Sequence, residues 1–343
     1  MLRAVLVTPL SGELAGYGRA GSIALEAWAA WHNGRFSPKI ELAVFDAGRD
    51  PAGALAAAQR RRADLLFGPY GSGPMAAVAA ATSRLIWNHG GARVPAARNI
   101  VTVLAPADTY FHGAIGAVRR ADPGVPSVCV LSGNTGFGRA VAEGAVREAG
   151  RLGLPVTEGP LGAAGGRAAV PDADVLLAAG RFEEEVAAAR RLLGRRWRAA
   201  GFVAAGVEEI LADLGGAREG LLGPAQWLAE TAPVPDEGPA AADFVEAYRR
   251  RADRDPPYPA AQAFAAGVIA TRCLREAGTA DDDALAAAAH AVRCTTMFAP
   301  FRLDPRTFRQ VGHRVLTVQW QDDVRRVIWP PERAQASLRY PLA

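Results

Sequence analysis

The sequence GYGRAG at residues 16–21 matches the G-x-G-x-x-G pattern of dinucleotide-binding loops, and Asp46 follows about 25 residues later. In such a loop the first glycine ends a strand, so that the next helix points its N-terminus at the pyrophosphate. Here residues 9–15 separate the expected first strand from Gly16. We therefore interpret the segment as a loop that enters a helix, and keep a nucleotide-dependent enzyme as the rival hypothesis.

A second segment, DLLFGPYGSGP at residues 64–74, joins an apolar strand to a glycine-rich turn, a hydroxyl group and a proline typical of a first helical turn. Free N–H groups at a helix start, the positive end of the helix dipole and the Ser72 hydroxyl together suit an anion such as a carboxylate. Alternatively, Ser72 only caps the helix. The spacing leaves both interpretations open.

The histidines and cysteines form no catalytic or metal-binding pattern. His89 lies in a loop with paired glycines at residues 87–92, whose backbone could approach a ligand closely. It has no serine, cysteine or second histidine at triad or metal-ligand spacing, which favours a hydrogen-bonded loop histidine. Buried free thiols are expected at Cys129, Cys273 and Cys294, which lie far apart in apolar contexts. We expect no cofactor, no metal and no enzyme activity.

The composition is that of an ordinary globular protein. The 343 residues include 39 Lys and Arg against 35 Asp and Glu, and 50% are hydrophobic, which excludes a disordered chain. Arginine runs without interleaved aromatic residues are typical of solvated helix faces, so no nucleic-acid partner is expected. No apolar run reaches the ~18 residues of a membrane span, and the start is too short for a signal peptide.

Short apolar runs alternate with alanine-rich stretches of helical period, which predicts βα units around parallel sheets. The first set has strands at residues 4–8, 41–46, 64–68, 85–87 and 100–104, and helices at 17–33, 51–62 and 74–84. The second has strands at 127–131, 175–179, 201–204 and 220–227, and helices at 139–152 and 183–193. After a proline-rich linker at 232–239 come helices at 241–251, 259–277 and 283–291, then antiparallel strands at 301–303, 313–320 and 324–329, with a turn at 321–323.

Several segments, taken in order, resemble type I periplasmic binding proteins, and most closely the leucine/isoleucine/valine-binding group. They are TPLSG at 8–12, residues 46–51, FGPYGSG at 67–73, GFGR at 136–139, YPAAQAF at 258–264 and residues 311–313. The resemblance covers nearly the whole chain. It implies an α/β fold of two doubly wound parallel-sheet lobes joined by a three-crossover hinge, with the ligand cleft between them. The implied lobes are residues 1–107 with 233–297, and 108–232 with 298–343.

The resemblance also implies a ligand site with contributions from both lobes. Its predicted residues are Tyr17, Tyr70, Gly71, Ser72, Gly91, Ala92, Phe137, Arg181, Phe182 and Ala205. Ser72 would supply the carboxylate-binding hydroxyl, and Gly91 and Ala92 would offer backbone groups. Phe137 would be the cleft aromatic residue of the second lobe, where relatives often have tyrosine. Arg181 and Phe182 would align with an aromatic cleft loop.

Ala205 departs from the pattern of the family, because amino-acid binders place an acidic residue there to pair with the α-ammonium group. Without that acid, a buried amine would remain unpaired at a cost of several kcal/mol. Either Glu208 or Glu209 replaces it from the same loop, or the ligand lacks an amine. In the second case Arg181 would favour an acidic or amide compound.

The predicted function is that of a substrate-binding protein of an ABC-type importer, which reversibly binds an amino acid, an amide or a related carboxylate. One alternative is a cytoplasmic ligand sensor of the amide-sensing type, and another is an interaction module that has lost its pocket. The protein partner would be an ABC permease or a regulatory protein. The location would be extracytoplasmic if a signal peptide has been removed, and cytoplasmic if Met1 is the native start.

Overall fold

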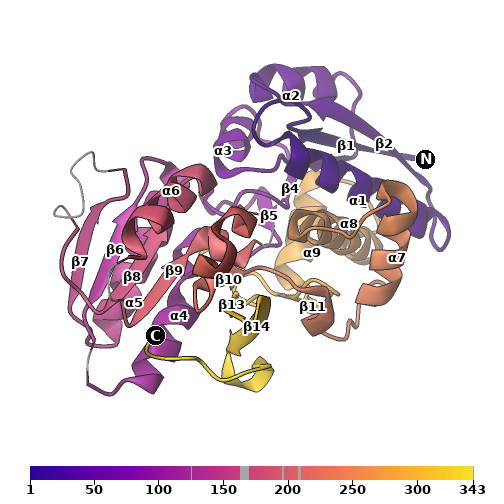
Figure 1. The fold of residues 1–343 in the computed structure, drawn as a ribbon. Helices are drawn as coiled ribbons and strands as arrows, with labels where there is room; N and C mark the ends of the chain where they lie inside the picture. The colour runs from indigo at the N-terminus through magenta and orange to yellow at the C-terminus, as the bar shows by residue number, and fades with distance from the viewer. Residues whose placement is uncertain (125, 163–169, 195–196, 208–209, 343) are drawn as a thin grey trace. The chain divides into compact units, whose positions relative to one another are not determined.

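The computed structural model describes residues 1–124, 126–162, 170–194, 197–207 and 210–342 (Figure 1). Packing divides the chain into two units, each made of two segments. Unit 1 comprises Met1–Ala105 and Trp227–Arg314, and unit 2 comprises Pro106–Gln226 and Val315–Ala343. Each unit has its own sheet and its own hydrophobic core, as expected of an independent domain.

The sheet of unit 1 has five parallel strands in the order β2-β1-β3-β4-β5. Its strands are β1 (Leu2–Thr8), β2 (Ile40–Asp46), β3 (Leu65–Phe67), β4 (Ile86–Asn88) and β5 (Ile100–Thr102). Its helices are α1 (Ala15–Asn33), α2 (Pro51–Gln59), α3 (Ser72–Ala80), α7 (Ala241–Ala252), α8 (Tyr258–Ala277) and α9 (Asp282–Ala291). Side chains alternate across a strand, so Leu6 joins the core under α1 and α8, while Val7 joins the core under α2 and α3.

The sheet of unit 2 has the order β14-β13-β10-β9-β8-β6-β7. Its parallel strands are β6 (Val128–Ser132), β7 (Val156–Pro160), β8 (Val175–Ala179), β9 (Ala199–Phe202) and β10 (Leu222–Ala225), and β13 (Leu316–Gln321) and β14 (Val324–Trp329) extend it in antiparallel fashion. The helices α4 (His112–Ala121) and α5 (Gly136–Arg151) pack apart from α6 (Phe182–Leu192), which covers the opposite face. Along the sheet, the parallel strands β7-β6-β8-β9-β10 repeat the order β2-β1-β3-β4-β5 of unit 1.

Short elements complete both units. Unit 1 contains η6 (Ala229–Thr231) and a small hairpin of β11 (Cys294–Thr295) with β12 (Pro300–Phe301). Unit 2 contains η1 (Ala107–Thr109), η3 (Val203–Gly206), η5 (Ala212–Arg218) and η7 (Pro331–Arg333). The turn between β13 and β14 has positive φ at both Asp322 and Asp323, which is the geometry of a type I′ hairpin. The predicted turn at 321–323 is confirmed.

The α/β class and the doubly wound parallel sheets predicted from the sequence are confirmed, but several details differ. Neither α4 nor β7 was among the predicted elements, and the helix predicted at 74–84 runs from Ser72 to Ala80. The chain last passes from unit 1 to unit 2 at 314–315, not at 297–298. The reason is that Phe298, Phe301 and Leu303 are buried in the core of unit 1, which keeps this segment there.

Candidate ligand-binding site

The doubly wound order of unit 1 reverses between β1 and β3. The helix that follows β1 packs on one face of the sheet, and the helix that follows β3 packs on the other. In open α/β sheets, ligands bind beyond the carboxyl ends of the strands at such a switch point. Four predicted residues follow these two strands, namely Tyr17, Tyr70, Gly71 and Ser72.

Ser72 is the first residue of α3 and not its cap. The N-cap is Gly71, whose φ of 98° is readily adopted only by glycine, and no side chain caps the helix. A Cβ at Gly71 would also lie 2.7 Å from Leu14 Cδ1. The Ser72 Oγ accepts a hydrogen bond of 3.0 Å from the Arg93 N–H, and the hydroxyl keeps its own hydrogen for an acceptor. The capping alternative is therefore wrong, and the hydroxyl lies beside the first N–H groups of the helix, which have no partner within it.

The loop that holds Gly91 and Ala92 is anchored by Asn88, the buried last residue of β4. The Asn88 side chain accepts from the Gly91 N–H at 2.8 Å and donates to the Gly91 carbonyl at 2.9 Å. Both backbone groups of Gly91 are thus bonded to Asn88, so further contacts there fall to the second lone pair of its carbonyl and to the backbone of the half-buried Ala92. Sequence reasoning missed Asn88, although a polar residue at the end of an apolar strand was a visible signal.

Three tyrosines come together at the same end of unit 1. The ring centroids of Tyr17 and Tyr70 are 4.9 Å apart, and Tyr258 lies 6.3 Å from Tyr17 and 6.5 Å from Tyr70. The hydroxyl groups of Tyr70 and Tyr258 share a hydrogen bond. We call Tyr17, Tyr70 and Tyr258 the tyrosine cluster. Tyr258 opens α8, far along the chain, so only the family-like segment at 258–264 could have pointed to it.

The glycine motif at residues 16–21 serves packing. It lies within the first turns of α1 and not between strand and helix. A Cβ at Gly18 would lie 1.7 Å from the Pro9 carbonyl oxygen, and one at Gly21 would lie 3.0 Å from His89 Cε1. Asp46 accepts hydrogen bonds of 2.8 Å from the N–H groups of Leu10 and Gly48, and the bond from Leu10 lowers the pKa of its carboxyl group. This geometry supports the packing interpretation over a pyrophosphate loop.

His89 is fully buried, and its ring lies beside Gly21 of α1. Burial lowers the pKa of its imidazole to about 4, although backbone groups of His89 and Gly68 partly offset the effect. The ring is therefore neutral near pH 7. Neither ring nitrogen has a hydrogen-bond partner among the described residues, so the expected side-chain hydrogen bond is not found. A buried neutral ring with no nucleophile beside it in the sequence fits a packing role.

In unit 2 the switch point lies between β6 and β8. Thr135 caps α5 by accepting from the Gly138 N–H at 2.9 Å, and Phe137 follows in the first turn. Its ring packs edge-on against Tyr110, with 5.5 Å between centroids. Gly133 donates to the Ala179 carbonyl at 2.7 Å, which joins the ends of the two strands. Phe137 therefore occupies in unit 2 the kind of position that Tyr17 and Ser72 occupy in unit 1.

The connection after β8 carries Arg181 and leads to Phe182, the first residue of α6, and η3 after β9 carries Ala205. Arg181 is the exposed N-cap of α6, and its N–H donates to the Glu184 carboxylate at 3.1 Å. Ala205 is fully buried in the core under α6, and its carbonyl accepts a 3.0 Å bond from the Trp320 indole. Its side chain thus packs in the core. Glu208 and Glu209, the predicted replacements for the missing acid, lie outside the described residues.

A carboxyl group that sequence reasoning missed lies just behind these loops. Glu185 is fully buried, and its two oxygens accept from the Gly180 N–H at 2.8 Å and from the Ala204 N–H at 2.7 Å. Burial raises the pKa of this carboxyl group to about 8, and the nearby Glu184 adds to the increase. The sequence shows only an acidic run at the start of a helix, which is the usual pattern of a solvated first turn.

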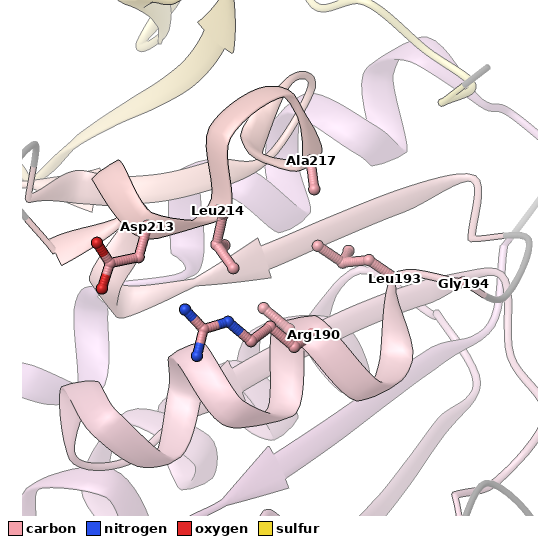
Figure 2. A pocket seen from close by; sticks show the side chains of 7 residues that line it. Arg190, Leu193, Gly194, Asp213, Leu214 and Ala217 are labelled. Atoms are coloured by element: carbon pink, nitrogen blue, oxygen red, sulfur yellow. The ribbon is translucent and has the colours of Figure 1, made fainter.

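A pocket of about 360 Å³ in unit 2 lies apart from the predicted residues, between α6 and η5. Figure 2 shows Arg190 and Asp213 at its polar side, with Leu193, Leu214 and Ala217 as apolar lining. None of the ten predicted site residues lines it. In the described parts of the chain, no helix is long and apolar enough to cross a membrane, and no cluster of metal-ligating side chains occurs.

The sequence matches a family model described as periplasmic binding protein over residues 2–325. No curated protein sequence matches the chain. Solved structures share its fold at low identity. A leucine-binding protein from Thermotoga maritima is 17% identical with a TM-score of 0.73, over 95% of this chain and 97% of the other.

Two further structures extend the comparison. A putative branched-chain amino acid ABC transporter protein from Silicibacter pomeroyi has a TM-score of 0.77 at 15% identity, over 99% of both chains. A solute-binding protein of an ABC transporter from Rhodopseudomonas palustris, solved with 3,4-dihydroxybenzoic acid, has a TM-score of 0.72 at 18% identity, over 94% of both chains. The TM-scores show that these proteins share the fold, and at such low identities the comparison shows the fold alone.

Proposed function

The chain belongs to the periplasmic binding protein family, and from that premise we propose that it is the substrate-binding protein of an ABC-type importer. Membership makes it a binding protein and not an enzyme, as the sequence predicted. We propose further that the ligand is a small polar metabolite with a carboxylate or amide group. The observation that carries this proposal is the start of α3, where Ser72 lies beside helix N–H groups at the switch point of unit 1.

The proposed contacts divide between the two units. In unit 1, Ser72 and the N–H groups at the start of α3 would bind the carboxylate, and Tyr17 and Tyr70 would contact the rest of the molecule. In unit 2, Phe137, Arg181 and Phe182 would supply the second set of contacts. The buried Ala205 offers no charge for an ammonium group, which supports ligands without an amine. The structure from R. palustris, solved with an aromatic acid, is consistent with such a ligand class.

A panel of matched ligands tests this proposal by thermal shift and calorimetry. L-Leucine carries both groups, 4-methylpentanoate lacks the amine, leucinamide lacks the carboxylate, and benzoate adds an aromatic ring. A ligand at about 100 times its Kd adds about 2.7 kcal/mol to the free energy of unfolding. We expect stabilisation by carboxylates, with 4-methylpentanoate and benzoate at least equal to leucine.

Substitution then tests the site. We expect Ser72→Ala to weaken carboxylate binding about tenfold, because one hydrogen bond to a charged group is lost. Ser83→Ala, at an exposed serine of the same unit, is the matched control and should leave Kd unchanged. Unchanged carboxylate binding in Ser72→Ala would contradict the assigned site. Stabilisation by NAD or ATP alone would contradict the whole proposal.

A further inference from the structure

Glu185 lies in the first turn of α6 and connects two loops that the β-sheet itself no longer joins. Strands β8 and β9 pair in parallel from Val175 with Ala199 to Ala178 with Phe202, an offset of 24 residues (202 − 178). The same offset would bring Gly180 opposite Ala204, two residues past the last pair. There the N–H groups of both residues donate to the two oxygens of Glu185. One side chain thus continues the connection where the backbone ladder stops.

The first of these loops carries two proposed ligand contacts, and the second carries the buried Ala205. Gly180 directly precedes Arg181 and Phe182, and Ala204 directly precedes Ala205. Because the Gly180 amide directly precedes the proposed contact residues, movement of this amide relative to the buried turn at Ala204 would move both contacts. Gly180 is also tightly placed, since a Cβ there would lie 2.6 Å from Leu161 and 2.8 Å from the Glu184 carboxylate.

The environment of Glu185 is costly for an acid. The residue has no exposed surface, and both Ala188 on its own helix and the bonded Ala204 belong to a cluster of buried apolar residues. Desolvation of a carboxylate is unfavourable unless its hydrogen bonds compensate, and apolar residues of similar volume often serve stability better. The charged neighbour from its own helix is Glu184, whose like charge opposes ionisation. A role other than stability would account for an acid at this position.

We infer that Glu185 is a positioning residue, which fixes the loop that carries Arg181 and Phe182 to the buried turn after β9. The inference rests on the proposed function, which assigns ligand contacts to Arg181 and Phe182. Glu185 itself would not touch the ligand. It would set the spacing between Arg181 with Phe182 on one side and Ala205 on the other.

The test is Glu185→Gln, which preserves shape but replaces one acceptor oxygen with an NH2 group that cannot accept from a backbone N–H. Glu183→Gln, at an exposed residue of the same helical turn, is the control. Calorimetry with benzoate and L-leucine gives Kd, and hydrogen exchange of peptides covering 176–182 and 200–206 reports on the two amides. We expect about tenfold weaker binding and faster exchange in both peptides for Glu185→Gln, and neither change for Glu183→Gln.

The outcomes separate the two proposals. Faster exchange in both peptides with unchanged Kd would overturn the positioning role and leave Glu185 a structural residue. If no probe binds the wild-type protein, the proposed function fails, and faster exchange in both peptides would still support Glu185 as the connection between the loops. If the variant does not fold, hydrogen exchange of the wild-type protein tests the inference instead. The Gly180 and Ala204 amides should then exchange with the same protection, and clearly different protection would overturn the inference.

Discussion

At the scale of single residues, burial decides which ionisable groups carry charge. Near pH 7, His89 is neutral because its ring lies inside unit 1, whereas burial inside unit 2 raises the pKa of the Glu185 carboxyl group to about 8. Neither effect is visible in the sequence, where His89 lies in a glycine-rich loop and Glu185 lies in an acidic run. Asp46, by contrast, remains ionised on the surface, because backbone N–H groups stabilise its charge.

His89 should make stability fall in mild acid. Its native pKa of about 4 lies below the value of 6.5 for a free histidine. As the pH falls from 6.5 to 4, the histidine therefore binds a proton in the unfolded chain but not in the native protein. Up to about 3 kcal/mol of unfolding free energy should be lost through this residue between neutral pH and the native pKa. Urea unfolding near pH 7 and near pH 4.5 should show a smaller loss in His89→Gln. An equal loss in both proteins would mean that the native ring takes up the proton.

At the scale of elements, glycines allow close contacts that local propensity does not encode. Gly18 brings α1 against the chain after β1, and in α4 Gly113 packs against Thr317 and Trp329 of the antiparallel strands. The second contact explains why α4 was not predicted. Two glycines, Gly113 and Gly116, lower its helix propensity, and only its packing against Trp329 accounts for them.

The glycine motif allows a matched comparison. Gly18→Ala should cost about 2 kcal/mol or more, because the new Cβ would meet the Pro9 carbonyl oxygen. Gly16→Ala meets nothing within 4 Å and should be neutral or gain up to about 0.5 kcal/mol, since alanine favours a helix. The urea concentration at the unfolding midpoint measures the stability change of both variants. Equal effects of the two substitutions would contradict the packing role of this motif.

At the scale of the whole molecule, one strand order is used twice, in two units with separate cores. The three cysteines report on these cores, since Cys273 and Cys294 lie in unit 1 and Cys129 lies in unit 2, all as buried free thiols. This confirms the sequence prediction. Burial raises the pKa of the Cys294 thiol to about 12 and also raises that of Cys273, so few thiolates are present to react.

Pulsed alkylation with iodoacetamide across a urea series should therefore label no cysteine in the native protein. Cys273 and Cys294 belong to the same cluster of buried side chains, so they should become reactive at one common midpoint, while Cys129 follows the opening of unit 2. Mass spectrometry of the labelled peptides distinguishes the sites. Separate midpoints for Cys273 and Cys294 would show that unit 1 does not open as one core.

The sequence by itself determined most of the regular elements and the family. Strand β8 at Val175–Ala179 and strand β14 at Val324–Trp329 begin and end where they were predicted. Buried parallel strands form continuous apolar runs, and hairpin strands are bounded by turn residues. Strand β7 escaped prediction because it pairs on one side only and is partly exposed, so Thr157, Glu158 and Pro160 are tolerated there.

Only the tertiary structure decided what the polar residues do. Whether Ser72 caps α3 depended on the backbone angle of Gly71, and whether Glu185 faces water depended on which loops lie beside its helix. The point at which the chain last passes from unit 1 to unit 2 depended on the burial of Phe298 and Phe301 in the core of unit 1. Apolar periodicity is a local property that a sequence shows directly. A hydrogen bond or a buried charge depends on partners far along the chain, which the fold alone brings together.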